Sequence, residues 1–301
     1  MRRFVLTGVL AALLSFALAG CTTWNDGPRY WWQSAMGQLD VLRRARPVAD
    51  VLDDPAADAR LRDRLELALR IRAFASRELA LPENASYTRY ADLGRPYVAW
   101  NVFTAPPLSL RLRQWCFPVV GCVSYRGYFA REDAERFAKR MREQGYETFV
   151  TGVPAYSTLG WFSDPLLNTF IHQPEPELAR LIFHELAHQR VYLKGDSTFN
   201  ESFATTVERV GVDRWLAARE AVTGDPAPRA AWQAISARRA DFLALLTRHR
   251  KALEEVFAAP LPDAEKVARR DRIFASLRAD YEQLKQRWGG FAGYDRWFAQ
   301  P

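Results

Sequence analysis

The chain has 301 residues, of which 26% are charged and 49% hydrophobic, and its formal net charge at pH 7 is +7. The basic excess is mild and lies on segments that also hold many acids, so it does not indicate nucleic-acid binding. A membrane surface is the more natural neighbour for such a charge. The chain contains no internal repeats and no low-complexity tracts.

Residues 1–20 have the pattern of a secretion signal. Arg2 and Arg3 precede an apolar run from Phe4 to Leu18, which is short for a membrane span. We therefore expect removal of residues 1–20, which leaves 281 residues and lowers the net charge from +7 to +5. The alternative, an amphipathic start to a cytoplasmic protein, fits less well with the small residues that end the run.

The end of this signal, Leu18-Ala19-Gly20-Cys21, resembles the bacterial lipobox, whose cysteine is acylated and becomes the new N-terminus. The resemblance implies that Cys21 carries a lipid and that a membrane is a partner of the protein. Residue 22 is Thr rather than Asp, which by the same resemblance favours the outer membrane over the inner one. The expected location is the periplasmic face of the outer membrane of the cell envelope.

Two helices are predicted in the scaffold that follows, from Pro28 to Ala45 and from Asp58 to Leu79. Pro47 and the acidic turn Asp53-Asp54-Pro55 separate them. The second helix keeps a helical period of apolar residues and has arginines on its other face. Three aromatic residues, Tyr30 to Trp32, suit either a membrane interface or a packed core, and we expect the core.

Between Tyr97 and Gly160 the pattern changes to short segments rich in aromatic and β-branched residues. We predict three strands, a helix ended by Gly145, a fourth strand and an extended piece, in this order: Tyr97 to Thr104, Ser109 to Trp115, Val123 to Phe129, Arg131 to Gln144, Glu147 to Gly152 and Ala155 to Phe162. Together these elements predict a small mixed sheet beside the helix that comes next.

Cys116 and Cys122 are the only cysteines that remain once Cys21 is lipidated. An oxidising periplasm would let them pair, so we predict a disulfide. The alternative is two small buried hydrophobic residues. Zinc binding by them is not expected, because neither a short Cys-x-x-Cys pair nor a nearby histidine is present.

The stretch from Ala179 to Val191 contains His184, Glu185 and His188 in the order H-E-x-x-H. Prolines and glutamates at its start and a periodic apolar stripe predict a helix. Residues four apart share one helix face, so both imidazoles can bind one Zn²⁺ ion while Glu185 acts as general base on the metal-bound water. The alternative is two core histidines on an amphipathic helix.

A catalytic zinc ion usually takes three protein ligands and leaves a fourth position for water. Glu201 follows His188 by thirteen residues, in a second helix that Asp196, Ser197 or Thr198 would open. HELAH followed by NESFA resembles the gluzincin metallopeptidases, in which a glutamate of the second helix completes the site. This resemblance implies that Glu201 is the third ligand.

Two further residues of the second helix bear on how the first histidine is held. Some gluzincins place an acid four residues after the ligand glutamate to orient that histidine, and here the position holds Thr205. Glu208 lies a turn further along the same face and is a candidate substitute. Its alternative role is that of a surface glutamate.

The C-terminal part is predicted to be mostly helical, over Val212 to Val222, Ala230 to Ala258 and Pro262 to Trp288. Gly224-Asp225-Pro226 and Pro260-Leu261-Pro262 break these helices. The remaining histidines, His172 and His249, are expected to be surface residues rather than ligands.

Four segments, LGRPYVAWNVF, WCFPVVGCVSYRGYF, GVPAYSTLGWF and LARLIFHELAHQ with NESFA, resemble a family of bacterial lipoproteins described as predicted zinc aminopeptidases. The resemblance runs from about Asp92 to Trp215 and implies a zincin-like fold and peptide substrates. In that fold the strand before the zinc helix pairs with extended substrate. Tyr156 to Trp161 is the segment in that place, so the candidate substrate-binding residues are Ser157, Thr158, Leu159 and Gly160.

The chain lacks the G-x-M-E-N segment whose glutamate holds the substrate amine in the best-known gluzincin aminopeptidases. Asp164, just past the expected edge strand, is the nearest acid in the sequence and a candidate partner for the substrate ammonium. Its alternative role is that of a turn residue before Pro165. Tyr156 is the candidate donor to the oxyanion.

These observations predict an α+β, zincin-like protein with a signal peptide at 1–20, a lipidated helical scaffold at 21–91, a catalytic core at 92–215 and a helical part at 216–301. The predicted function is hydrolysis of peptide bonds by zinc-activated water in the cell envelope, as an aminopeptidase. The alternatives are a zinc endopeptidase and a catalytically weak lipoprotein that acts in binding or assembly.

Overall fold

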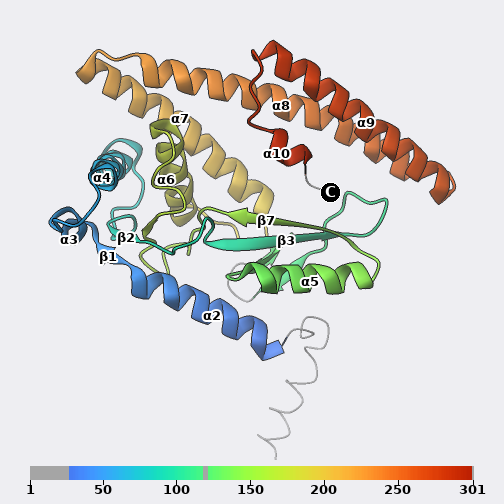
Figure 1. Cartoon of the computed structure of the whole chain (residues 1–301), viewed down its shortest axis with the longest axis horizontal. Coiled ribbons are helices and arrows are strands. Elements are labelled where there is room, and N and C mark those ends of the chain that lie inside the picture. The colour runs from blue at the N-terminus through green and yellow to red at the C-terminus, as the bar shows by residue number, and fades with distance from the viewer. Residues whose placement is uncertain (1–26, 118–120, 300–301) are drawn as a thin grey trace, which may run out of the picture.

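The structure, a computed structural model, describes residues 27–117 and 121–299. Its elements define an α+β fold in which long helices surround two small sheets and a β-hairpin (Figure 1). The predicted signal peptide, the lipobox and Cys21 lie outside the described residues. In the part of the chain that is described, no helix is long and apolar enough to cross a membrane.

The N-terminal scaffold contains α2 (Gly27–Arg44), α3 (Val48–Leu52) and α4 (Ala59–Leu79), which confirms both predicted long helices. α4 begins where the Asp58 carboxylate accepts a hydrogen bond of 3.1 Å from the Leu61 amide. On α2 the structure corrects the expected core position of the aromatic residues, because Trp31 and Trp32 are 54% and 68% exposed.

A small mixed sheet ties this scaffold to the centre of the chain. β1 (Arg46–Pro47) pairs antiparallel with β2 (Arg89–Ala91), and β2 pairs parallel with β8 (Leu166–Leu167). One hydrophobic cluster contains residues of the scaffold, such as Val41, together with residues of the later helices, such as Leu216. The predicted boundary at residue 91 therefore does not separate two packed units.

The larger sheet is antiparallel rather than mixed, and its central strand is β3 (Ala99–Ala105). β6 (Arg126–Tyr128) pairs with one edge of β3 and β7 (Glu147–Val153) pairs with the other. Trp100 and Val102 of β3 pack in one cluster with α5 (Arg131–Glu143). Since side chains alternate along a strand, Asn101 and Phe103 lie on the opposite face of the sheet.

Three predicted extended segments differ in the structure. Residues 109–114 form a loop, because Pro106-Pro107 and Leu108, with φ 54°, turn the chain, and only β4 (Trp115–Phe117) is extended. The predicted strand from Val123 to Phe129 is divided at Ser124 and Tyr125 into β5 (Gly121–Val123) and β6. The expected edge strand Tyr156 to Trp161 is wrong, since residues 159 and 160 turn with φ 56° and 82°.

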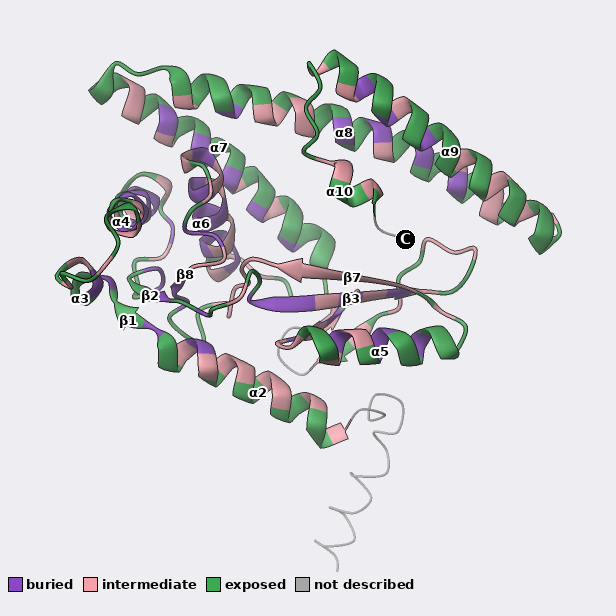
Figure 2. Cartoon of the chain, in the orientation of Figure 1, coloured by how far each residue is buried: buried purple, intermediate pink, exposed green. Residues whose placement is uncertain are grey.

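α6 (Glu175–Arg190) is largely buried, as Figure 2 shows. Leu178, Ile182 and Leu186 are each 0% exposed, which confirms the predicted apolar stripe. This stripe anchors α6 against α4, α7 (Ser197–Thr223) and α8 (Ala227–Ala258). The opposite side of α6, which carries the histidines, is thereby held in a fixed orientation.

α7 lies close beside α6. Asp196 caps it by accepting a hydrogen bond of 2.9 Å from the Phe199 amide. A Cβ atom at Gly211 would lie 2.8 Å from the ring of Phe183, so this glycine permits the close approach of the two helices. α7 continues to Thr223, and the predicted boundary between residues 215 and 216 is therefore wrong, because it falls inside one packed helix.

β4 and β5 form a hairpin in which Cys116 lies opposite Cys122, and the two sulfurs form a disulfide. Gly121 has a φ of 79°, and a Cβ atom there would lie 2.7 Å from the backbone nitrogen of Gly195. The hairpin thus packs backbone against backbone on the loop between α6 and α7.

α8 and α9 (Asp263–Arg287) confirm the last two predicted helices and form a hairpin, with α10 (Asp295–Phe298) packed against it (Figure 1). Trp232, near the start of α8, belongs to the main hydrophobic cluster, whereas Phe242 onward belongs to a separate cluster with α9. The surface position expected for His249 is wrong. It is 7% exposed, because α9 folds back and places Asp280 at 2.9 Å from its Nε2.

Candidate metal centre and cavity

α6 presents His184, Glu185 and His188 to one large cavity. The two imidazole rings lie 4.8 Å apart between centroids, and their Nε2 atoms are 3.2 Å apart. This is the neighbour relation that helical spacing of four residues provides. The two nitrogen atoms that could bind a cation therefore face the same point.

Glu201, in the second turn of α7, completes this cluster. Its Oε2 lies 3.4 Å from Nε2 of His184 and its Oε1 lies 3.6 Å from Nε2 of His188. The possible ligand atoms of the three residues all lie within 4.8 Å of one another, and no other group of this kind occurs among the described residues. His184, His188 and Glu201 are therefore the residues that could hold a metal ion, and His172, which is exposed, is not among them.

Glu208, rather than Thr205, contacts the first histidine. Glu208 is 5% exposed, and its Oε2 accepts a hydrogen bond of 2.9 Å from Nδ1 of His184. Thr205 is exposed and has no hydrogen bond to His184. A proton held on Nδ1 leaves the lone pair of Nε2 directed at the cluster, so Glu208 fixes both the tautomer and the orientation of the ring.

A chain of charged residues supports Glu208 from behind. Arg180 of α6 donates to Glu208 at 3.0 Å and to Glu177 at 2.8 Å. Arg239 of α8 donates to the other oxygen of Glu177 at 2.9 Å. These bonds connect three helices to the imidazole of His184, and they compensate the buried charge of Glu208.

The electrostatics of the cluster favour a positive charge. Burial lowers the pKa of His184, but hydrogen bonds to Glu201 and Glu208 and the charges of Glu185 and Glu208 outweigh it and raise the pKa to about 10. The hydrogen bond to His184 is the main reason that the pKa of Glu201 is lowered. A proton or a metal cation would both be stabilised at this point.

Glu185 lies beside the cluster, and its pKa is shifted in the opposite direction to that of Glu201. Burial raises the pKa of Glu185 to about 7, with a smaller contribution from Asp164 and Glu201, while His184 and Arg180 act in the opposite direction. A carboxylate with a pKa near neutrality can accept a proton and return it, which is what general acid–base chemistry requires. Glu185 is thus chemically distinct from the pair of acids that contact His184.

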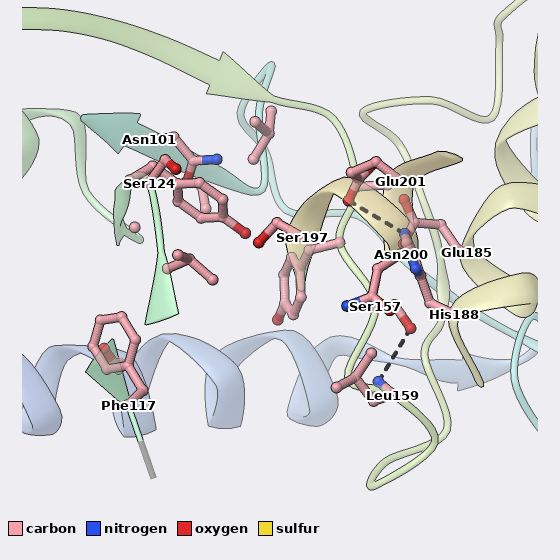
Figure 3. Close-up of a pocket in the computed structure, with 18 of the residues that line it drawn as sticks. Asn101, Phe117, Ser124, Ser157, Leu159, Glu185, His188, Ser197, Asn200 and Glu201 are labelled. Carbon is pink, nitrogen blue, oxygen red and sulfur yellow. Dashed lines mark hydrogen bonds and ion pairs between the residues drawn. The ribbon is translucent and has the colours of Figure 1, made fainter. Parts of the chain in front are cut away.

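The cavity has a volume of about 790 Å³ and is lined by several elements distant in the sequence. α2, β3, the disulfide hairpin and the segment after β7 form its walls, and α6 and α7 close one end. Figure 3 shows Glu185, His188 and Glu201 at one end, and Asn101, Ser124 and Phe117 at the other. The cluster thus lies at one end of the cavity.

Sequence reasoning missed two tyrosines of this lining, Tyr125 and Tyr192. The hydroxyl of Tyr125 has no hydrogen-bond partner among the described residues. Burial, with the charges of Glu201, Tyr192 and Glu185, raises the pKa of Tyr125 to about 12, so it keeps its proton. No signal in the sequence pointed to Tyr125, because it stands inside the single strand predicted from Val123 to Phe129, which the structure divides at Ser124 and Tyr125.

Tyr156, the expected oxyanion donor, also lines the cavity, but its hydroxyl is engaged elsewhere. It donates a hydrogen bond to Oε1 of Gln38 on α2. Burial raises its pKa far above the ordinary value for tyrosine. The structure therefore favours Tyr125 over Tyr156 as a residue with an available proton facing the cavity.

The segment before α6 contributes less to the cavity than expected. Ser157 and Leu159 line it, with the Ser157 hydroxyl accepting a hydrogen bond of 3.1 Å from the Leu159 amide (Figure 3). Thr158 and Gly160 do not line it. Because these residues form a turn, they offer no regular strand edge to an extended peptide.

Asp164 does not line the cavity. It is 4% exposed, and its carboxylate accepts hydrogen bonds from the Thr158 hydroxyl at 2.8 Å and the Thr158 amide at 3.0 Å. Burial raises the pKa of Asp164 to about 6. The expectation that it meets a substrate ammonium is therefore wrong: the carboxylate closes the turn.

The fold and the cluster define an α+β protein with a two-histidine, one-glutamate centre at the end of a large cavity. Residues 29–301 match the model of a family described as putative aminopeptidase. The chain belongs to that family, which implies peptide substrates. No curated protein and no solved structure matches the chain.

Proposed function

We propose that this protein is a zinc-dependent peptidase of the gluzincin type, with a zincin-like arrangement of α6 and α7. The observation that carries this proposal is the convergence of His184, His188 and Glu201, whose possible ligand atoms lie within 4.8 Å of one another. Membership of a putative aminopeptidase family supports hydrolysis of peptide bonds as the reaction.

The residues present fit a Zn²⁺ ion. Two imidazole nitrogens and a carboxylate oxygen are the ligand types of catalytic zinc sites, which keep a further position open. The bond from Nδ1 of His184 to Glu208 leaves Nε2 as the binding atom, as a zinc-ligating histidine needs. When bound, the ion would polarise the scissile carbonyl and lower the pKa of a water molecule.

The chain's own groups would then move the proton and hold the developing charge. Glu185 would take a proton from the attacking water and pass it to the leaving amine. Tyr125 is the group with an available hydroxyl, and it would donate a hydrogen bond to the oxyanion. Glu208 and Arg180 would keep His184 in one orientation throughout.

Zinc dependence is tested by measuring bound zinc and peptide hydrolysis in one preparation. We expect about one zinc ion per chain and loss of hydrolysis on chelation. Glu185→Gln keeps the shape but cannot accept the proton, so it should retain zinc and lose at least about a hundredfold in rate. The matched control is Glu143→Gln, on the exposed face of α5, which should leave both unchanged.

The joint measurement of bound zinc and hydrolysis also separates a peptidase from a protein that acts only in binding or assembly. Zinc that is bound without any hydrolysis across a peptide library would favour a lipoprotein that acts in binding or assembly. Undiminished turnover in Glu185→Gln would contradict the peptidase mechanism.

The family description favours removal of N-terminal residues, and one observation favours internal cleavage as a second candidate. Among the described residues, the only carboxylates that line the cavity are Glu185 and Glu201, both already assigned to the reaction. No further acid there would pair with a substrate ammonium. Equal cleavage of acetylated and free peptides would establish an endopeptidase, and loss of cleavage on acetylation would establish an aminopeptidase.

The proposed location is the cell envelope, with Cys21 as the site of a lipid anchor. Its support is the lipobox pattern of residues 18–21. Fractionation of cells that express the full chain tests it, with Cys21→Ser as the variant. Release of that variant from the membrane fraction is the expected result, and its retention there would contradict the anchor.

A further inference from the structure

The inner wall of the cavity is one face of β3. Ala99, Asn101 and Phe103 line the cavity, while Trp100 and Val102 pack on the other face of the sheet against α5. This division follows from the alternation of side chains along a strand. A ligand in the cavity would therefore meet the apolar side chains of Ala99 and Phe103 and the amide side chain of Asn101 on this strand.

The outer wall is aromatic. Tyr30 and Trp31 of α2 line the cavity together with Phe117 of the disulfide hairpin. The rings of Tyr30 and Phe117 stack with centroids 5.9 Å apart, and Trp31 meets Phe117 edge to face at 5.8 Å. Because these rings pack on one another, they form a firm apolar surface rather than separate flexible side chains.

The charged side chains that line the cavity all have a role in the proposed reaction. Of the described residues that line the cavity, none is a lysine or an arginine, and the acids are Glu185 and Glu201 at the catalytic end. A charged side chain of a ligand would lose its hydration on entry and find no partner of opposite sign away from that end. Apolar side chains would instead gain from leaving water.

Asn101 is the polar exception on the inner wall. It stands between Ala99 and Phe103, and its side chain forms no hydrogen bond with another described residue. Figure 3 places it at the end of the cavity away from Glu185 and Glu201. An amide in an apolar wall can both donate to and accept from a peptide group.

We infer that the cavity selects uncharged, apolar peptide segments, which lie between β3 and α2 with Asn101 as their hydrogen-bond anchor. A volume of about 790 Å³ is typical of pockets that enclose a whole small ligand, so the segment comprises more than one side chain. This inference rests on the proposed function, since it names the substrate class of the same site.

The first test compares peptides that differ only in charge at the residues beside the scissile bond. Norleucine, lysine and glutamate have similar chain lengths, so they separate charge from size. We expect kcat/KM for norleucine peptides to exceed that for lysine and glutamate peptides by at least about tenfold. Equal cleavage of all three series would overturn the inference and leave the peptidase proposal standing.

The second test uses two phenylalanines of neighbouring strands. Phe103 lines the cavity, and Phe149 of β7 lies directly opposite it in the sheet but outside the lining. Phe103→Ala should lower kcat/KM for phenylalanine peptides by about tenfold and change that for alanine peptides little. The ring of Phe149 lies 6.3 Å from that of Phe103, so Phe149→Ala is the control for loosening the packing of Phe103, and it should change the preference much less than Phe103→Ala. The same loss in both variants would assign the effect to sheet stability and overturn the inference.

The third test adds one charge at the anchor. Asn101→Asp keeps the shape of the side chain and places a carboxylate on the inner wall. It should raise kcat/KM for lysine peptides relative to norleucine peptides by about tenfold, through attraction across a distance of a few ångströms. An unchanged ratio would mean that substrates do not reach this part of the cavity, which would overturn the inference.

Binding measurements distinguish failure of this inference from failure of the proposed function. Glu185→Gln protein, titrated with the same peptides, reports binding without turnover. If wild-type protein hydrolyses nothing but Glu185→Gln protein binds norleucine peptides over glutamate peptides, the inference holds and the peptidase proposal fails. Equal binding of both peptides would overturn the inference whatever the wild-type protein hydrolyses.

Discussion

Two helix pairs of this protein differ in how far their residues are buried. α6 and α7 hold the candidate metal centre, and α6 is buried along most of its length, with Phe183 and Leu186 at 0% exposure. α8 is the longest of the four helices, and α9 buries only Leu277, Tyr281 and Leu284. The candidate metal centre therefore lies on the pair whose residues are more deeply buried. Packing fixes the positions of side chains there, which a metal centre needs.

The charged residues of the two pairs differ in the same way. The C-terminal hairpin carries exposed ion pairs such as that of Arg250 with Glu254. Such pairs contribute only about 0–1 kcal/mol each to the stability of the fold. Near the centre, Glu208 is almost fully buried between Arg180 and His184. Removing one member there leaves a buried charge without its partner, which is far more costly.

The largest expected effect comes from the two glutamates of α7. Glu201→Ala should remove bound zinc almost completely, because one of three ligands is lost. Glu208→Ala should retain zinc and lose roughly 10- to 100-fold in affinity or activity, because it only orients His184. Zinc content and turnover of both variants are the measurements. Loss of zinc in Glu208→Ala alone would reverse the assignment.

A smaller effect, on stability, sharpens the comparison between the helix pairs. Phe183→Ala in α6 and Tyr281→Ala in α9 each remove a buried ring, and each should cost about 3–5 kcal/mol of local stability. Only Phe183→Ala should also weaken zinc binding, since Phe183 packs against Gly211 of α7. Thermal unfolding and zinc titration check this. Equal losses of zinc affinity would show that the hairpin supports the centre as strongly as α6 does.

The smallest expected effect concerns Asp164 and pH. Burial raises its pKa from 3.8 to about 6, so the folded protein binds this proton more tightly than the unfolded chain. Its contribution to stability is therefore complete below about pH 4 and is lost as the pH rises to about 6. The difference in unfolding free energy between wild type and Asp164→Asn should change by on the order of 2–3 kcal/mol across this window.

Asp164→Asn also tests the placement of this side chain. Since the carboxylate bonds to Thr158 and does not line the cavity, KM for peptides with a free N-terminus should stay unchanged. Denaturant unfolding at several pH values and peptide kinetics are the measurements. A raised KM for free peptides alone would restore Asp164 as the partner of the substrate ammonium.

Sequence patterns were sufficient for features that depend on local spacing. The four-residue interval between His184 and His188, the prolines before α6 and the capping residue Asp196 all act within one or two helical turns. Glu201 needed a family resemblance, because its distance from the histidines depends on how α7 turns back along α6. That turn depends on the close contact at Gly211, which spacing alone does not encode.

The predictions that were wrong or missing concern residues whose positions depend on contacts between segments distant in the sequence. His249 was expected at the surface because its neighbours are arginines, and its partner Asp280 lies 31 residues later. Asp164 follows a segment that resembles an edge strand, but its carboxylate turns that segment on itself. Tyr125 and Asn101 line the same cavity as the centre only because α2, the sheet and the hairpin enclose one space. No local pattern specifies that enclosure.

The division of α8 between two hydrophobic clusters has a consequence for where the chain can be cut. Trp232 packs in the main cluster and donates to Asp213 of α7 at 2.8 Å, and Arg239 reaches Glu177 of α6. A fragment that stopped at Gly224, the obvious break in the sequence, would lose both supports. A fragment that included both supports and left out the hairpin's own cluster would therefore end in the middle of a helix, beyond Arg239 and before Phe242.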